Sequence, residues 1–190
     1  MKSDNKKPDL YRVWISTSGY RDENYKSYLE NKVFWLSDQY NISQNYDLSK
    51  ITSLEEARSI LSYYASSHYN FSQVVKKGDY LLLIRRNYYY TKVIGVTLTL
   101  CKFVGDYKYL PDGNYHHSRA IEVILENIPM WIFTNRLQGL LRRGFFYRSS
   151  KNIDEELIHT IWAYSYFLVK AGRIDEQTFK KVQKIKLTKS

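Results

Sequence analysis

The sequence has a single cysteine, no long apolar run and no internal repeat, and each scarcity excludes a class of protein. Cys101 is the only cysteine among 190 residues, so no disulfide forms within the chain, and we expect a reducing, cytoplasmic setting. No run approaches 18 apolar residues, which predicts a protein without a membrane span. The first twelve residues are polar and charged and lack the apolar core of a signal peptide.

The motifs of the common enzyme classes are also missing. There is no G-x-x-x-x-G-K-S/T phosphate loop, no G-x-G-x-x-G and no H-E-x-x-H. His116 and His117 are adjacent, so on a strand they point to opposite faces and do not readily share a metal. Asp79, Asp106 and Glu122 are conceivable as a nuclease-type carboxylate set, but Asp79 follows a glycine as a turn residue does. The sequence therefore predicts a binding protein without cofactor, metal or catalytic residues.

Basic and aromatic residues are abundant. Lys and Arg number 29 against 19 Asp and Glu, a net charge of +10, and there are 19 Tyr, eight Phe and four Trp. Cations bind phosphates and flat rings stack on bases, so this combination favours a nucleic-acid partner. A protein-docking surface rich in tyrosine, with basic charge that aids solubility, is the alternative that composition leaves open.

The order of apolar patterns predicts an α+β protein centred on residues 74–100. Two runs rich in Val, Ile, Leu, Thr and Tyr, residues 80–84 and 91–100, flank an Arg-Arg-Asn-Tyr-Tyr-Tyr tip and predict a β-hairpin. Further strands are expected at 10–16, 33–37 and 116–126, and a short helix or loop at 21–31. Helices are expected from 52 to between 66 and 70, at 133–141, from 152 to about 170 and at 175–185. We expect a recognition domain over 10–150 and a helical C-terminal extension over 151–190, which packs on it or leads to a further domain.

Two tryptophans sit beside hydroxyl residues. Trp14 precedes Ser16 on the first expected strand, where core packing is the favoured interpretation. Trp35 precedes Ser37 between polar segments, a better place for a partly exposed indole. A base held between rings needs flat walls and a few hydrogen-bonding groups for its edge.

Five segments in this order resemble the PUA-like superfamily, in particular EVE and YTH domains. They are VWIST at 13–17, VFWLS at 33–37, KKGDYLLLI at 76–84, KVIGVTLTL at 92–100 and HHSRAIEVILE at 116–126. The chain looks most like the N-terminal recognition domain of McrB-type modification-dependent restriction enzymes. The resemblance covers about residues 10–133.

The resemblance implies particular roles for some positions. In YTH domains a Trp in the second segment forms one wall of a cage for N6-methyladenine, and Trp35 occupies that place. The Lys-Ser pair of YTH domains reads Ser16-Thr17 here, and no tryptophan lies between residues 100 and 117 to form the second wall. A tyrosine must then serve, with Tyr107 and Tyr109 as the candidates.

The resemblance thus implies a PUA-like twisted β-barrel of five or six strands, flanked by helices. It implies a module that binds double-stranded DNA and flips a methylated base into an aromatic cage, N6-methyladenine first and 5-methylcytosine next. Possible partners are a GTPase motor domain and a nuclease subunit of a restriction complex; an RNA-binding module for methylated RNA or tRNA is the alternative. The expected base-binding residues are Trp35, Tyr107, Tyr109, Trp14, Ser16 and Ser37, and the expected phosphate-binding residues are Arg85, Arg86, Lys92, Arg119, Arg142 and Arg143.

Overall fold

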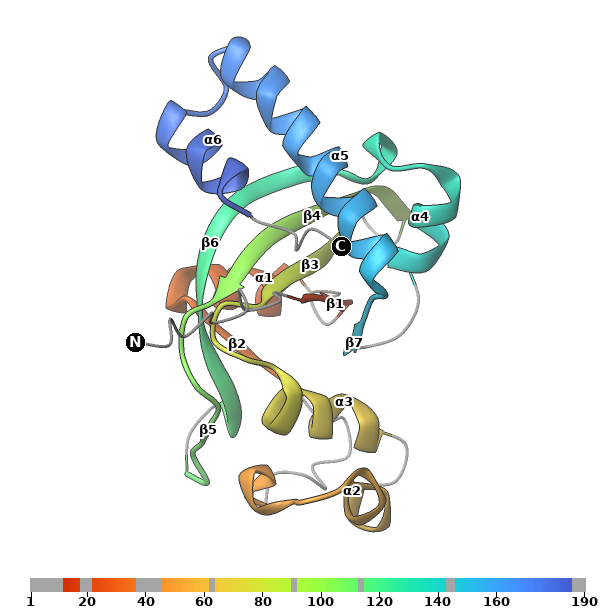
Figure 1. Cartoon of the computed structure of the whole chain (residues 1–190), viewed down its shortest axis with the longest axis vertical. Helices are drawn as coiled ribbons and strands as arrows, with labels where there is room; N and C mark the ends of the chain where they lie inside the picture. The colour runs from red at the N-terminus through yellow and green to blue at the C-terminus, as the bar shows by residue number, and fades with distance from the viewer. Residues whose placement is uncertain are drawn as a thin grey trace, which may run out of the picture.

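A computed structural model describes residues 12–17, 22–36, 46–61, 64–89, 92–112, 115–142 and 146–185. They form an α+β fold in which helices flank one curled, mixed sheet (Figure 1). The seven strands among these residues are β1 (Val13–Ser16), β2 (Val33–Trp35), β3 (Tyr80–Tyr89), β4 (Lys92–Phe103), β5 (Lys108–Tyr109), β6 (His117–Pro129) and β7 (Phe146–Arg148). The α-helices are α1 (Asp22–Asn31), α2 (Leu54–Leu61), α3 (Ala65–Tyr69), α4 (Asn135–Leu141), α5 (Lys151–Lys170) and α6 (Glu176–Gln183).

The strands run in the order β2-β6-β4-β3-β1-β7, and the short β5 pairs with β6 beside this path. Strand β1 is parallel to β3, whereas the other pairs are antiparallel. The α+β class and the curled sheet with flanking helices agree with the sequence-based expectation.

The predicted hairpin is confirmed, but its predicted tip is wrong. Arg85 and Arg86 lie inside β3, opposite Thr97 and Val96 of β4, and the two strands stay paired as far as Tyr89 opposite Lys92. Arg, Asn and Tyr interrupt the apolar pattern without breaking the strand, because cross-strand pairing tolerates polar side chains where a sheet extends beyond the core. Residues 90 and 91 lie outside the described part of the chain.

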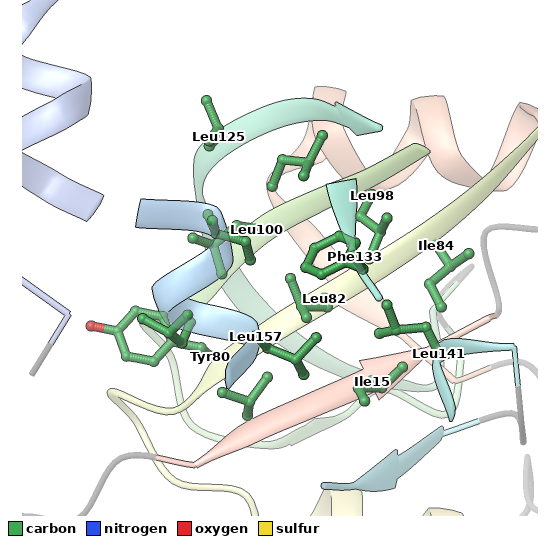
Figure 2. Packing of buried hydrophobic residues seen from close by; sticks show 14 of the residues in the cluster. Ile15, Tyr80, Leu82, Ile84, Leu98, Leu100, Leu125, Phe133, Leu141 and Leu157 are labelled. Atoms are coloured by element: carbon green, nitrogen blue, oxygen red, sulfur yellow. The ribbon is translucent and has the colours of Figure 1, made fainter. Parts of the chain in front are cut away.

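Both faces of the sheet are covered, which explains the continuous apolar run in β3. Leu82 faces a core shared with α4, α5 and α6, whereas Leu81 and Leu83 face a second core rich in aromatic rings. Figure 2 shows the first core, in which Leu82 and Leu100 of the sheet pack near Leu157 of α5. Alternate residues of one strand thus supply two separate cores.

The C-terminal helices share this first core rather than forming a separate layer of their own. Leu157, Ile158 and Ile161 of α5 and Val182 of α6 are at most 3% exposed and belong to the same cluster as Val13 of β1. The residues expected to form an extension therefore complete the hydrophobic core of the sheet. No helix in the described ranges has the length and apolar character needed to cross a membrane.

The helical segment after α2 extends a little beyond its predicted end. The predicted helix ends between residues 66 and 70, whereas α3 continues into a π-helical turn, η5 (Asn70–Val74). Single-turn 3-10 helices occur at η3 (Leu48–Lys50) and η6 (Met130–Ile132). The carbonyls that the π turn leaves exposed are bound by a side chain from β6, a long-range contact that local sequence patterns do not reveal.

Candidate functional site

Trp35 ends β2, the edge strand of the sheet, and packs against two tyrosines. Its ring centroid lies 4.0 Å from that of Tyr115, and the two planes are only 26° apart, so these rings stack. Tyr28 of α1 lies 4.0 Å away on a tilted plane, at 58°. We call Trp35, Tyr115 and Tyr28 the Trp35 cluster. Within this cluster the tryptophan is only 7% exposed.

Helix α1 holds the Tyr115 side chain in place. The Tyr115 hydroxyl shares a hydrogen bond of 2.8 Å with Ser27 Oγ, and Asn31 Nδ2 donates to the same hydroxyl at 3.4 Å. Asn31 Nδ2 also donates to the carbonyl of Ser27, at 2.9 Å. Because Ser27 and Asn31 are four residues apart, they lie on one face of the helix, directed at the tyrosine.

The predicted pairing of Trp35 with Tyr107 or Tyr109 is wrong, and the sheet register gives the reason. Trp35 lies opposite Ser118 of β6, whereas Tyr109 of β5 lies opposite His117. Adjacent residues of a strand point to opposite faces, so the two aromatic side chains are directed to opposite sides of the sheet. Tyr115, which the sequence analysis did not select, is the ring that stacks on Trp35.

Tyr107 and Tyr109 instead enclose His117; these three residues form the His117 cluster. Their ring planes lie 15° and 21° from that of the imidazole. The Tyr107 hydroxyl and His117 Nδ1 share a hydrogen bond of 2.7 Å, and burial raises the pKa of Tyr107. His117 is 1% exposed, so this cluster is closed to a ligand in the structure.

Arg119 is a buried structural residue, so its predicted contact with phosphate is wrong. It is 4% exposed, and its Nε and Nη2 atoms donate to the carbonyls of Phe71 and Ser72 at 2.9 and 3.1 Å. Its guanidinium lies over the rings of Phe71 and Tyr107. Burial lowers the pKa of Arg119 to about 10, which still leaves it charged at neutral pH. Its charged guanidinium stabilises the π-helical turn by donating hydrogen bonds to two of its carbonyls.

Trp14 and Ser16 are also in the core, where neither is accessible to a base, contrary to prediction. Both are 0% exposed. Trp14 stacks on Phe146 with the rings 5.2 Å apart and 1° from parallel, and its indole nitrogen donates to Asp79. The faces and the polar atom of this tryptophan are thus occupied.

The carboxylates considered as a nuclease set have separate partners. Asp79 accepts three hydrogen bonds from the chain around it, and Glu122 accepts one from Lys181 at 2.7 Å. Asp106 is exposed. Across the described ranges, no group of three or more His, Cys, Asp and Glu side chains is arranged to hold a metal ion.

Two arginines expected at phosphates, Arg85 and Arg86, lie on β3 and are aligned with the C-terminal end of β6. Arg85 pairs with Thr97, which pairs with Pro129 at the end of β6, whereas Trp35 pairs with Ser118 near its start. Eleven residues of β6 separate the two positions along the strand, but the sheet is curled. Arg85 packs over the ring of Tyr25, 4.9 Å from its centroid, and Tyr25 is one turn of α1 from Tyr28 of the Trp35 cluster. Arg85 therefore lies near the Trp35 cluster, across α1.

The remaining predicted residues are either distant from Trp35 along the chain or outside the described part of the structure. Arg142 is exposed and ends α4, which follows β6 and η6, so it is distant along the chain path from the Trp35 cluster. Ser37, Arg143 and the side chain of Lys92 lie outside the described residues.

Lysines that the sequence analysis did not select lie near Trp35. Lys108 of β5 pairs with Ser118, the residue that Trp35 pairs with from the other side, so Lys108 and Trp35 share a face of the sheet. Lys32, also exposed, immediately precedes β2. Only the pairing of β5 with β6 reveals the position of Lys108, because a two-residue strand in a turn-rich loop leaves no periodic signal.

A further polar group follows Tyr115 in the chain. This is His116, whose Nδ1 atom is buried with no hydrogen-bond partner among the described residues. A buried nitrogen without a partner is destabilising unless a ligand or water binds it. His116 is therefore a candidate for a polar contact with a ligand at the Trp35 cluster.

Comparisons of the chain with protein-family models, with curated proteins and with solved structures return no match. Function is therefore inferred from the residues and their geometry.

Proposed function

We propose that this protein binds nucleic acid that carries a modified base, and that the base stacks on Trp35. The observation that carries the proposal is the stack of Tyr115 on Trp35, with centroids 4.0 Å apart and planes 26° apart, at the edge of the sheet. A purine or pyrimidine ring is flat and stacks on an indole as the phenol ring does. Tyr115 thus occupies the position that an extruded base would take.

Extruding a base from a duplex costs a few kcal/mol, and stacking on an aromatic side chain contributes about 1–3 kcal/mol per ring. Because the base replaces the stack of Tyr115 on Trp35, most of that contribution is offset, and contacts with the phosphates must supply the remainder. Tyr28 supplies a second ring beside the indole, and an apolar wall of this kind suits a methyl group. His116 Nδ1 is the polar group proposed to contact the edge of the base.

Lys32 and Lys108 are proposed to contact the backbone of the nucleic acid. Both are exposed and lie near the Trp35 cluster, before β2 and on β5. Such contacts are independent of sequence and weaken with salt, because binding releases counterions from the phosphates. Arg86 and Arg142 would contribute only to a longer nucleic acid that reaches the far end of the sheet.

The ligand and setting follow from the resemblance of the sequence. The cage tryptophan of YTH domains makes N6-methyladenine in DNA the first choice, with 5-methylcytosine second. We propose a PUA-like fold for the curled sheet, and a recognition role within a restriction complex whose GTPase and nuclease are other components. In this proposal the chain itself binds and does not catalyse.

A binding comparison tests the proposed function. Fluorescently labelled duplexes with one N6-methyladenine, one 5-methylcytosine or no modification are titrated with the protein, and a methylated RNA of the same sequence is the fourth ligand. We expect the N6-methyladenine duplex to bind about fourfold more tightly than the unmodified one, since burial of one methyl group contributes about 0.8 kcal/mol. Equal binding of all four ligands would overturn the proposal, and preference for the RNA would reassign it to RNA.

Variants of tryptophan locate the site. Trp35→Ala is expected to remove the preference for the methylated duplex while salt-dependent binding remains, and Trp35→Phe to retain part of it. Trp131→Ala is the matched control, because Trp131 is 76% exposed and follows the far end of β6. If Trp131→Ala removes the preference and Trp35→Phe does not reduce it, the base binds elsewhere.

A further inference from the structure

We propose that Tyr115 is a latch that keeps the Trp35 cluster closed until a ligand ring displaces it. This inference rests on the proposed function, since the displacing ring is taken to be a base. Tyr115 covers one face of the Trp35 indole. Trp35 is only 7% exposed, which leaves too little room for another ring to stack on it. Binding at Trp35 therefore requires Tyr115 to move.

The latch has a defined attachment on helix α1. Ser27 Oγ lies 2.8 Å from the Tyr115 hydroxyl and Asn31 Nδ2 lies 3.4 Å from it. Asn31 is additionally fixed by its bonds to the carbonyl and the hydroxyl of Ser27, at 2.9 and 3.1 Å. Two hydrogen bonds thus act on the end of the tyrosine farthest from its backbone, where they resist rotation of the ring.

Tyr115 makes two kinds of contact: its ring stacks on Trp35, and its hydroxyl is hydrogen-bonded to Ser27 and Asn31. A ligand can replace only the first. A base that stacks on Trp35 replaces the ring contact of Tyr115, but it does not restore the hydroxyl bonds to Ser27 and Asn31 unless it reaches α1. Breaking the hydrogen bonds of the Tyr115 hydroxyl therefore costs free energy that every ligand must supply in order to bind at Trp35. In a two-state description, apparent affinity equals the intrinsic affinity multiplied by the open fraction.

This description makes a specific prediction about selectivity. Loosening the latch raises the open fraction for every ligand alike, so affinity for methylated and unmodified duplexes should rise by the same factor and their ratio should stay constant. Loss of the two hydroxyl bonds in Tyr115→Phe corresponds to about a three- to tenfold increase in affinity, from the usual strength of such bonds. Ser27→Ala, which removes one bond directly, should give a smaller increase.

Opening can be measured without any nucleic acid. In a Trp131→Phe, Trp162→Phe background, the remaining tryptophans are Trp14, which is 0% exposed, and Trp35. Quenching of their fluorescence by acrylamide then reports exposure of Trp35, because Trp14 stays in the core. We expect quenching to increase in Tyr115→Phe and in Ser27→Ala relative to the background protein.

Ser59→Ala is the matched control. Ser59 also lies on a helix surface and donates to a backbone carbonyl, of Glu56, at 2.8 Å, but it is on α2 and has no contact with Tyr115. It should change neither quenching nor affinity. Thermal unfolding followed by circular dichroism checks that each variant is folded at the temperature of measurement.

The outcomes separate the two proposals. The latch is supported if tryptophan quenching increases in both Tyr115→Phe and Ser27→Ala and if affinity for the methylated and the unmodified duplex rises by the same factor. Unchanged quenching in Tyr115→Phe and Ser27→Ala overturns it, even where Trp35→Ala shows that the base binds at Trp35. Increased quenching without preference for any methylated ligand leaves the latch standing and overturns the proposed function.

Discussion

The indole nitrogen of Trp14 donates a hydrogen bond of 2.9 Å to Oδ2 of Asp79, and this bond joins β1 to the turn before β3. The same carboxylate accepts from the backbone nitrogens of Arg12, at 3.2 Å, and Lys76, at 3.0 Å. Asp79 is 2% exposed. One buried side chain thus satisfies three donors from segments more than sixty residues apart, which explains why an acidic residue follows the Gly78 turn.

Replacing this carboxylate should destabilise the fold. Asp79→Ala leaves the Trp14 nitrogen buried without a partner, along with two backbone donors, and we expect the free energy of unfolding to fall by about 2–4 kcal/mol. Urea denaturation followed by circular dichroism measures it. Asp106→Ala is the control, because Asp106 is exposed. A change in Asp79→Ala no larger than in the control would show that the bond contributes little.

Much of the secondary structure could be predicted, because it depends on local patterns. The apolar run at Tyr80–Ile84 and the amphipathic pattern at residues 52–61 correspond to β3 and α2. The hairpin was predictable for the same reason. The length of β3 was not, because pairing with β4 carries it through Arg85 and Arg86, where the local pattern becomes polar.

The candidate site depended on register, which local patterns do not contain. Trp35 and Tyr109 are on opposite faces only because they pair with adjacent residues of β6. Arg119 resembles any surface arginine in the sequence, and its burial follows from the carbonyls of the π-helical turn that it binds. Tyr115 lies just before β6, and only the position of α1 shows that it stacks on Trp35.

The salt dependence of nucleic-acid binding should identify the phosphate contacts. If Lys108 neutralises one phosphate, Lys108→Ala should reduce the slope of log affinity against log salt by about 0.9. The reason is that Lys108 is exposed and shares a sheet face with Trp35. Titrations of a short duplex at several salt concentrations measure the slope.

Arg142→Ala provides the comparison for this experiment. Arg142 is also exposed and cationic, but it ends α4 beyond the far end of β6. The variant should leave the slope for a short duplex unchanged. A reduced slope in Arg142→Ala with none in Lys108→Ala would show that Arg142, one of the phosphate contacts expected from the sequence, binds the nucleic acid and that Lys108 does not.

Cys101 should be unreactive in the folded protein. It is 0% exposed on β4, and burial raises the pKa of its thiol, so the reactive thiolate is scarce. We expect a thiol reagent such as an aromatic disulfide to modify it only as fast as the protein unfolds. The rate should therefore rise steeply with urea, in parallel with loss of the circular dichroism signal. Rapid modification in buffer would contradict the buried position.

Asp154 should make stability depend on pH. It lies in the first turns of α5, is 4% exposed, and accepts hydrogen bonds from Ser149 Oγ and, at 3.4 Å, from the Val13 nitrogen. Burial raises the pKa of this carboxyl to about 7, against an ordinary value of 3.8. The folded state therefore holds a proton that the unfolded chain has released, and stability is lost as the pH rises from about 4 through 7.

Asp154→Asn isolates this effect, because the amide resembles the protonated acid. Its oxygen can accept from Val13 and its nitrogen can donate to Ser149 Oγ, which can in turn donate to the Val13 carbonyl. Between pH 5 and pH 8 the native protein should lose about 1–3 kcal/mol of unfolding free energy relative to the variant, since each pKa unit corresponds to about 1.4 kcal/mol. Parallel stability curves for the two proteins across that range would show that Asp154 is already ionised at pH 5 and that its burial carries no such cost.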